Sequence, residues 1–99
     1  MGKQENAIQK ACLDYLTLKN IFHWRNNSGA FSRGGHFYKF GAKGSPDIIC
    51  CIDGQLIAIE CKTRTGEQSP DQKEFQRGLE KAGGKYWLVR DVRDLIIKL

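Results

Sequence analysis

Two carboxylates and a lysine are spaced so that a β-hairpin would bring them together. Asp47 begins one apolar run and Glu60 lies near the end of the next, each six residues from the nearer member of the Asp53-Gly54 pair between the runs. Asp-Gly is a strong signal for a two-residue turn, and pairing about it places the two acids opposite each other, with Cβ atoms about 5 Å apart. Lys62 follows Glu60 by two residues and so falls on the same face of its strand.

These residue types fit the chemistry of metal-assisted phosphodiester hydrolysis. Opposed like charges repel each other, and a divalent cation between them converts the repulsion into coordination. Magnesium takes hard oxygen ligands and keeps several waters, so Asp47, Glu60 and the Cys61 backbone carbonyl form a sufficient ligand set. Such a metal lowers the pKa of bound water and polarises a phosphate. Lys62 is then placed to orient or deprotonate the attacking water or to offset negative charge; an ordinary ion pair with Glu60 is the alternative.

A basic segment without acids precedes the predicted hairpin. Residues 15–46 contain no Asp or Glu, five basic residues and seven of the ten aromatic residues, whereas the remaining 11 basic residues are balanced by the 11 acidic ones. A basic, aromatic and glycine-rich segment is typical of a surface that binds a polyphosphate backbone. The alternative is a solvated surface with aromatic side chains in the core. We expect nucleic acid to contact residues of this segment and of the loops beside the hairpin: Arg25, Asn26, Asn27, Arg33, His36, Lys39, Lys43, Ser45 and Arg64.

The hydrophobic pattern predicts which elements position these residues. Apolar residues at helical spacing predict a helix over 3–19, and strand composition predicts strands over 21–25, 36–40, 47–52, 55–62 and 85–90. Residues 26–29 and 32–35 have loop composition. The two strands of the hairpin are apolar on both faces, which predicts an α/β sheet covered by helices on both sides.

Two further helices are predicted, and two polar residues have alternative roles. Ser69 and Pro70 open a helix that ends before Gly83, and Asp91 precedes a final helix. Gln72 lies three residues after Ser69, so it either completes a capping box or faces the site. Glu5 lies on the buried side of the first helix, where it is either a favourable charge at the helix N-terminus or a third acid near the metal.

Size and composition predict one intracellular domain over residues 1–99. The sequence contains no apolar signal region and no stretch of membrane-spanning length, which predicts a cytoplasmic protein without a membrane partner. The four cysteines show no metal-ligand spacing, so they are expected to be reduced, buried side chains. A P-loop and a dinucleotide-binding glycine motif are both lacking, so no nucleotide cofactor is expected.

The residues of the predicted site and several residues that flank it resemble those of a known family. Pro46-Asp47 followed by Glu60-Cys61-Lys62 is similar to the PD-(D/E)xK nuclease signature. Several flanking features are similar to the VRR-NUC branch in its small standalone, phage-type form: Gly44-Ser45 before the first acid, the Ser69-Pro70-Asp71-Gln72 helix start and the late Val89-Arg90. The resemblance covers nearly the whole chain, from Glu5 to the last strand.

The resemblance implies a restriction-endonuclease-like core, in which a mixed sheet of about four strands is flanked by helices. It also implies a Mg²⁺-dependent DNA endonuclease in which Mn²⁺ substitutes, with roles for Gln72 and for Glu5, the latter reaching the metal through water. Members of this group are associated with branched DNA such as Holliday junctions, cut by homodimers, in a bacterial cell or a phage-infected host. Two alternatives remain open: a less selective nuclease or nickase on flaps or single strands, and a non-catalytic DNA-binding module of the same fold.

Overall fold

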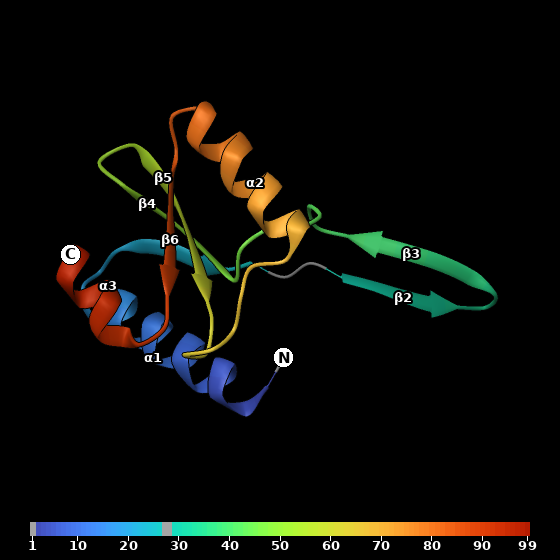
Figure 1. Ribbon diagram of the computed structural model, residues 1–99, viewed down its shortest axis with the longest axis horizontal. Helices are drawn as coiled ribbons and strands as arrows, with labels where there is room; N and C mark the ends of the chain where they lie inside the picture. The colour runs from blue at the N-terminus through green and yellow to red at the C-terminus, as the bar shows by residue number, and fades with distance from the viewer. Residues whose placement is uncertain (1, 27–28) are drawn as a thin grey trace.

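We analysed a computed structural model that describes residues 2–26 and 29–99, without the side chains of residues 29–31 and 38–40. Figure 1 shows its elements, which follow in chain order: α1 (Lys3–Leu18), β1 (Phe22–Arg25), β2 (Gly29–Arg33), β3 (His36–Phe40), β4 (Ile48–Ile52), β5 (Gln55–Cys61), α2 (Pro70–Lys81), β6 (Lys85–Val89) and α3 (Val92–Lys98). All three predicted helices and all five predicted strands are present. In the described part of the chain, no helix combines the length and the apolar character needed to cross a bilayer.

The central sheet is mixed and has four strands, in the order β1-β4-β5-β6. β4 is antiparallel to both β1 and β5, and β6 runs parallel to β5. The Asp53-Gly54 turn is the strict two-residue turn that the sequence predicted, because Ile52 pairs with Gln55 and Ile48 with Ile59. Asp53 has a φ of 51° and Gly54 a φ of 80°, as a type I′ turn requires at both central positions.

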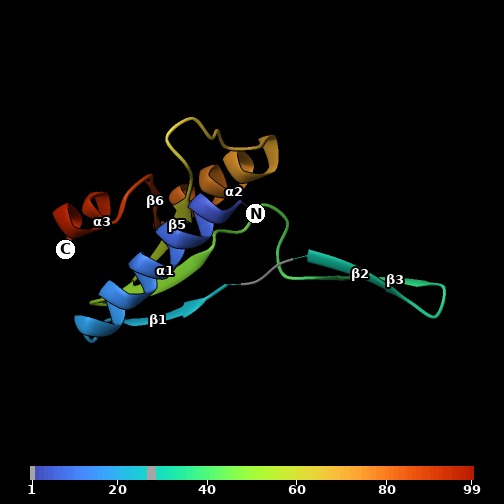
Figure 2. The same cartoon turned by 90° about the horizontal axis from the view of Figure 1, so that it is seen from below.

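Helices cover both faces of this sheet, as Figures 1 and 2 show. α1 and α3 lie on one face over a cluster that includes Cys50, Ile57 and Ile59. α2 lies on the other face and packs its apolar residues against a smaller cluster of Ile49, Ala58 and Tyr86. The alternation of inward-facing residues along β4 and β5 therefore produces two buried layers. The predicted α/β sheet covered by helices on both sides is confirmed.

Three of the four cysteines are buried as the sequence predicted, whereas Cys51 is only partly buried. All four are free thiols, and Cys12, Cys50 and Cys61 are buried. Cys12 on α1 and Cys61 on β5 belong to the same core cluster. Their role in the described fold is that of small apolar side chains.

The second sheet is a two-stranded ribbon that the sequence analysis did not predict. β2 pairs with β3 in antiparallel register from Gly29↔Phe40 to Arg33↔His36. The assignment of residues 26–29 and 32–35 to loops was therefore wrong for Gly29, Ser32 and Arg33, which belong to β2. Only Gly34 and Gly35 form the turn, with φ values of 58° and 79°. A Gly-Gly pair adopts this mirror-image turn without steric cost, which allows both flanking segments to continue as strands.

Candidate active site

The first acid of the predicted pair is held across the hairpin by a backbone donor. Asp47 lies just before β4, and its Oδ2 accepts a hydrogen bond of 2.9 Å from the backbone N–H of Cys61. Glu60 precedes Cys61 on β5 and is only 2% exposed. The period of two along β4 and β5 places Asp47 with Ile49, and Glu60 with Ala58, on the face that α2 covers. The structure thus brings the two carboxylates together at one end of a buried sheet.

The Glu60 side chain differs from an ordinary buried acid in its pKa and in its hydrogen bonding. Burial first, and then the charge and the hydrogen-bonding proximity of Asp47, raise the pKa of Glu60 to about 9. Its Oε2 is buried and has no hydrogen-bond partner among the described residues. A buried, unpaired carboxylate oxygen is costly, so the pair retains a proton near neutral pH unless a cation compensates it. The arrangement therefore favours binding of a cation.

Lys62 lies at the carboxyl end of the same strand. Its backbone N–H donates to the carbonyl of Val89 at 2.9 Å, which continues the parallel pairing of β5 and β6. Its positive charge acts to lower the pKa of Glu60, against the dominant effects of burial and Asp47. Lys62 and Glu60 do not form an ion pair, since the salt bridges between described residues join other side chains. The simple ion-pair alternative is therefore not formed.

The turn before Asp47 is fixed from two sides. Asn26, just after β1, donates from its side-chain amide to Ser45 Oγ at 3.1 Å and to the Pro46 carbonyl at 2.9 Å. Its backbone N–H donates to the Asp47 carbonyl at 2.7 Å. On the other side, Gly44 has a φ of 73°, and a Cβ at this position would overlap the backbone carbonyl of Asp71 at the start of α2. The sequence analysis placed Asn26 and Ser45 on nucleic acid, and the structure also gives them a role in holding Asp47.

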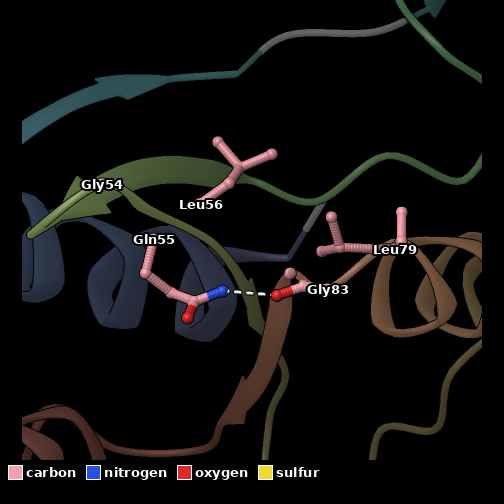
Figure 3. Close-up of a pocket in the computed structure, with 7 residues that line it drawn as sticks. Gly54, Gln55, Leu56, Leu79 and Gly83 are labelled. Atoms are coloured by element: carbon pink, nitrogen blue, oxygen red, sulfur yellow. Dashed lines mark hydrogen bonds between the residues drawn. The ribbon is translucent and has the colours of Figure 1, made fainter.

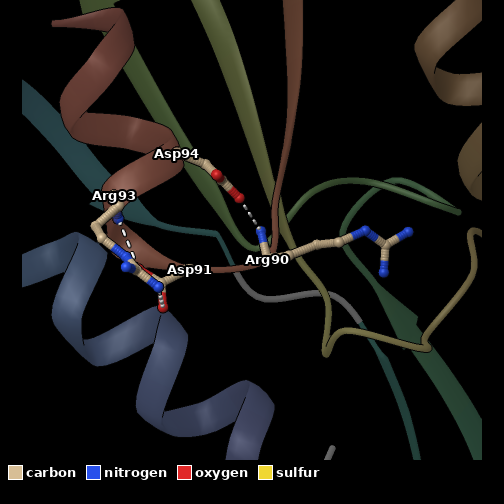
Figure 4. Close-up of polar contacts among 4 residues, drawn as sticks. All are labelled: Arg90, Asp91, Arg93 and Asp94. Atoms are coloured by element: carbon tan, nitrogen blue, oxygen red, sulfur yellow. Dashed lines mark hydrogen bonds and ion pairs between the residues drawn. The ribbon is translucent and has the colours of Figure 1, made fainter.

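Arg90 organises the loop that follows Lys62. Its guanidinium donates to the carbonyls of Thr63 at 2.5 Å, Gly66 at 2.7 Å and Arg64 at 3.1 Å. Its backbone N–H donates to Asp94 Oδ2 at 2.9 Å, as Figure 4 shows. From the sequence, Val89-Arg90 was a feature of the family resemblance only, and these hydrogen bonds were not predicted. Predicting these hydrogen bonds would have required knowing that β5 and β6 are parallel neighbours, because this pairing brings the residues that follow the two strands side by side.

Glu5 and Gln72 are placed less directly. Gln72 Oε1 accepts from the Ser69 N–H at 2.8 Å, and the Gln72 N–H donates to Ser69 Oγ at 3.1 Å, so the capping-box alternative is formed. Glu5 lies in the first turn of α1, which begins on the side from which the β2–β3 ribbon projects (Figures 1 and 2). Its charge makes a minor contribution to raising the pKa of Glu60. The catalytic roles of both residues remain predictions.

The ligand set for a metal is small. Among the described residues, no group of three or more His, Cys, Asp or Glu side chains is placed to hold a metal ion. The predicted set therefore consists of the Asp47 and Glu60 carboxylates and the Cys61 carbonyl, with Glu5 acting through water. These are all hard oxygen donors, which is the ligand type that magnesium prefers.

The predicted nucleic-acid contacts are distributed over the ribbon and its surroundings. Arg33 and His36 are opposite each other in the strand register at the tip of the ribbon, and both are exposed. Lys43 has an 80% exposed side chain and lies 3.7 Å from an Asp71 carboxylate oxygen. Arg25 ends β1, and Arg64 is exposed on the loop that Arg90 holds. Asn27 lies outside the described residues, as does the side chain of Lys39.

Tyr86 is a residue near the site that the sequence analysis did not single out. Its side chain is 8% exposed and belongs to the cluster under α2. The pKa of Tyr86 is raised to about 12, mainly by burial and further by the charges of Glu60 and Asp47. Its buried hydroxyl has no hydrogen-bond partner among the described residues. Alternation along β6 could have placed Tyr86 on this face, but only with the parallel register, which pairs Ala58 with Tyr86, already known.

A separate shallow pocket lies at the other end of β5. Gln55 Nε2 donates to the Gly83 carbonyl at 2.5 Å beside Leu56 and Leu79 (Figure 3). None of the residues that line this pocket carries a formal charge. It borders the Asp53-Gly54 turn, whereas the acids lie at the opposite end of the hairpin, so it is not part of the candidate site.

Comparison with known proteins identifies the fold. No protein-family model and no curated protein match the sequence. A solved structure described as a VRR_NUC domain matches the fold with a TM-score of 0.70 and 18% sequence identity, covering 98% of this chain and 97% of that chain. The predicted VRR-NUC-type fold is therefore confirmed over nearly the whole chain.

Proposed function

We propose that this protein is a metal-dependent DNA endonuclease that hydrolyses phosphodiester bonds. The observation that carries the proposal is the buried Glu60 carboxylate beside Asp47, with an oxygen that no described residue pairs and a pKa raised to about 9. No group among the described residues pairs with this oxygen, and a bound cation would compensate both carboxylates at once. The similarity to a VRR_NUC domain structure supports a nuclease-type domain.

The residues present fit a magnesium ion, with manganese as a substitute. Asp47, Glu60 and the Cys61 carbonyl would hold the ion, and Glu5 would contribute through water. When bound, such an ion supplies charge compensation at the phosphate and makes water more acidic. The protein's own contribution is to keep two acids in place in a low-dielectric environment, where their interaction with a cation is strong.

Other residues would position and assist. Asn26 and Gly44 fix the turn that carries Asp47, and Arg90 fixes the loop beyond Lys62. Lys62 would orient or deprotonate the attacking water, or offset negative charge near the phosphate. The acid-free segment of residues 15–46 would draw the nucleic-acid backbone toward a site whose own acids repel it.

We further propose that the substrate is branched DNA such as a Holliday junction and that the active form is a homodimer. A junction with two-fold symmetry is resolved by two cuts, which a symmetric dimer with two active sites supplies. The support for this finer proposal is the family resemblance of the sequence together with the matching fold.

Cleavage of a four-way junction under a titration of Mg²⁺ or Mn²⁺ tests the proposal. Asp47→Asn should reduce the cleavage rate by a factor of about 1,000 or more, because it removes charge at the reacting centre. Asp14→Asn is the matched control, since Asp14 is exposed on α1 and pairs only with Lys10 among the described residues. Cleavage that needs no divalent cation, or that Asp47→Asn leaves intact, would refute the site.

Substrate choice and assembly are tested on the same preparation. Flap, single-stranded and unbranched duplex DNA should be cut more slowly than the junction. The mass in solution should be that of two chains. Equal rates on all substrates would favour a general nuclease, and a monomer that resolves junctions would refute the dimer.

A further inference from the structure

The β2–β3 ribbon, Gly29–Phe40, is here called the arm, and it lies outside the packed body. Figures 1 and 2 both show it projecting from one side of the molecule. In the described chain, β2 and β3 pack substantially only against each other. The radius of gyration is 14.1 Å and the longest extent 46 Å, whereas a compact chain of this length has a radius of gyration of about 13 Å. Because an isolated two-stranded hairpin is marginally stable in water, the arm is suited to being covered by a partner.

Both ends of the arm are anchored beside the candidate active site. β2 begins shortly after Asn26, whose side chain bonds to Ser45 and Pro46. β3 ends three residues before the 44–47 turn, which packs on the start of α2. Five paired residues extend about 17 Å, which is about half of the ~34 Å helical repeat of duplex DNA. The arm would therefore extend along about half a helical turn of a duplex bound at Asp47 and Glu60.

The chemistry of the tip points to nucleic acid. Arg33 and His36 face each other across the Gly34-Gly35 turn, and both are exposed. The arm lies inside the 15–46 segment, which contains no acidic residue. A Cβ added at either glycine would meet nothing within 4 Å, so the tip is narrow and unobstructed. The charge of the arm is thus complementary to a polyanion.

The dimensions of the arm favour one groove of one kind of duplex. The major groove of B-form DNA is about 12 Å wide and admits a two-stranded β-ribbon. The minor groove is about 6 Å wide and takes such strands only where the duplex is bent and the groove widened, which costs deformation energy. The major groove of double-stranded RNA is deep and narrow, so side chains cannot read it. We propose that the arm lies in the major groove of the B-form duplex flanking the cleaved bond, with Arg33 at its tip contacting base edges. The position relative to the cleaved bond rests on the proposed nuclease function; the groove contact does not.

Dimethyl sulfate footprinting separates the two grooves in one experiment, since the reagent methylates guanine N7 in the major groove and adenine N3 in the minor groove. The wild-type chain is bound to junction and duplex DNA in the presence of a chelator, so that no cleavage occurs. We expect protection of guanine N7 over about half a helical turn and unchanged adenine N3. Arg33→Gln should lose the part of this protection farthest from the junction.

Affinity measurements by fluorescence anisotropy complete the test. Arg33→Gln should weaken binding to duplex DNA about five- to tenfold and leave binding to double-stranded RNA of the same sequence unchanged. The matched control is Lys81→Gln, an exposed charge at the end of α2 away from the arm (Figure 1), which should bind as the wild type does. Circular dichroism should confirm that both variants keep the fold.

The inference would be overturned by protection of adenine N3, by an equal loss of affinity for RNA and DNA duplexes, or by a footprint that Arg33→Gln does not alter. If Arg33→Gln instead halves the mass of the protein without DNA, the arm covers a second copy of the chain, and the inference is wrong. Guanine protection without any cleavage in Mg²⁺ would support the contact of the arm with the major groove and contradict the nuclease function. Cleavage without guanine protection would support the nuclease function and contradict the contact of the arm.

Discussion

Replacing Glu60 by Gln should stabilise the metal-free protein while abolishing its proposed activity. The pKa of Glu60 is raised from an ordinary 4.5 to about 9 by burial and by Asp47. The folded protein therefore holds a proton that the unfolded chain releases, and the stabilisation by this proton is fully present below about pH 4.5 and is lost as the pH rises toward about 9. At about 1.36 kcal/mol per pH unit, the loss by about pH 8 has an upper limit of about 5 kcal/mol. Glutamine keeps the shape without the titration, so we expect Glu60→Gln to be more stable than the wild type by about 2 to 5 kcal/mol at that pH.

Urea unfolding followed by fluorescence of the two tryptophans measures this difference. In a chelator, the stabilities should converge near about pH 4.5 and diverge as the pH rises. Added Mg²⁺ or Ca²⁺ should raise the stability of the wild type at about pH 8, by about 2.7 kcal/mol at a concentration of 100 times the dissociation constant, and should have much less effect on the variant. Glu67→Gln, on the exposed loop before α2, is the control and should follow the wild type. Parallel stability curves for wild type and Glu60→Gln across this pH range would refute the reasoning.

Three further predictions concern the residues that position the site. Gly44→Ala should lower the free energy of unfolding by about 2 kcal/mol or more and reduce cleavage, because its Cβ would overlap α2, whereas Gly34→Ala, with open space, should cost only about 1 kcal/mol on chemical denaturation. Asn26→Ala should remove two hydrogen bonds to the turn, costing about 1 to 3 kcal/mol, and should reduce kcat more than it raises KM in steady-state cleavage; an unchanged kcat would contradict the positioning role. Arg90→Met should free the carbonyls of the loop after Lys62 and increase hydrogen exchange at Gly66, whereas Arg93→Met, whose side chain pairs only with Asp91 among described residues, should not.

Local signals in the sequence were sufficient for the hairpin that carries the acids. The Asp53-Gly54 turn sets the register of β4 and β5, and alternation then places Asp47, Glu60 and Lys62 on one face. The helix caps at Ser69 and Asp91 are likewise written in neighbouring residues and were found where expected. Such features depend on residues close in the chain, which is why sequence alone could predict them.

The arm was predicted only in part, since residues 36–40 were expected to form a strand but their pairing with β2 was not. Gly34-Gly35 is also a two-residue turn signal, but the flanking segments contain glycine and serine and have no alternation that marks a buried face. Because the arm is not packed against the body, burial does not impose a pattern on it. The composition of residues 15–46 therefore predicted its charge but not its shape.

The sequence by itself determined the acidic pair, the register that opposes its members, the helix-covered α/β sheet around the hairpin and the basic segment. Only the tertiary structure decided how deeply Glu60 is buried, and hence the direction and size of its pKa shift, since desolvation depends on the helix packed above it. It also assigned Asn26 to the turn before Asp47 and Arg90 to the loop after Lys62, across 20 and 27 residues of chain respectively. Contacts of this kind arise from the order of strands in the sheet and the packing of loops at its end, which short-range spacing does not encode.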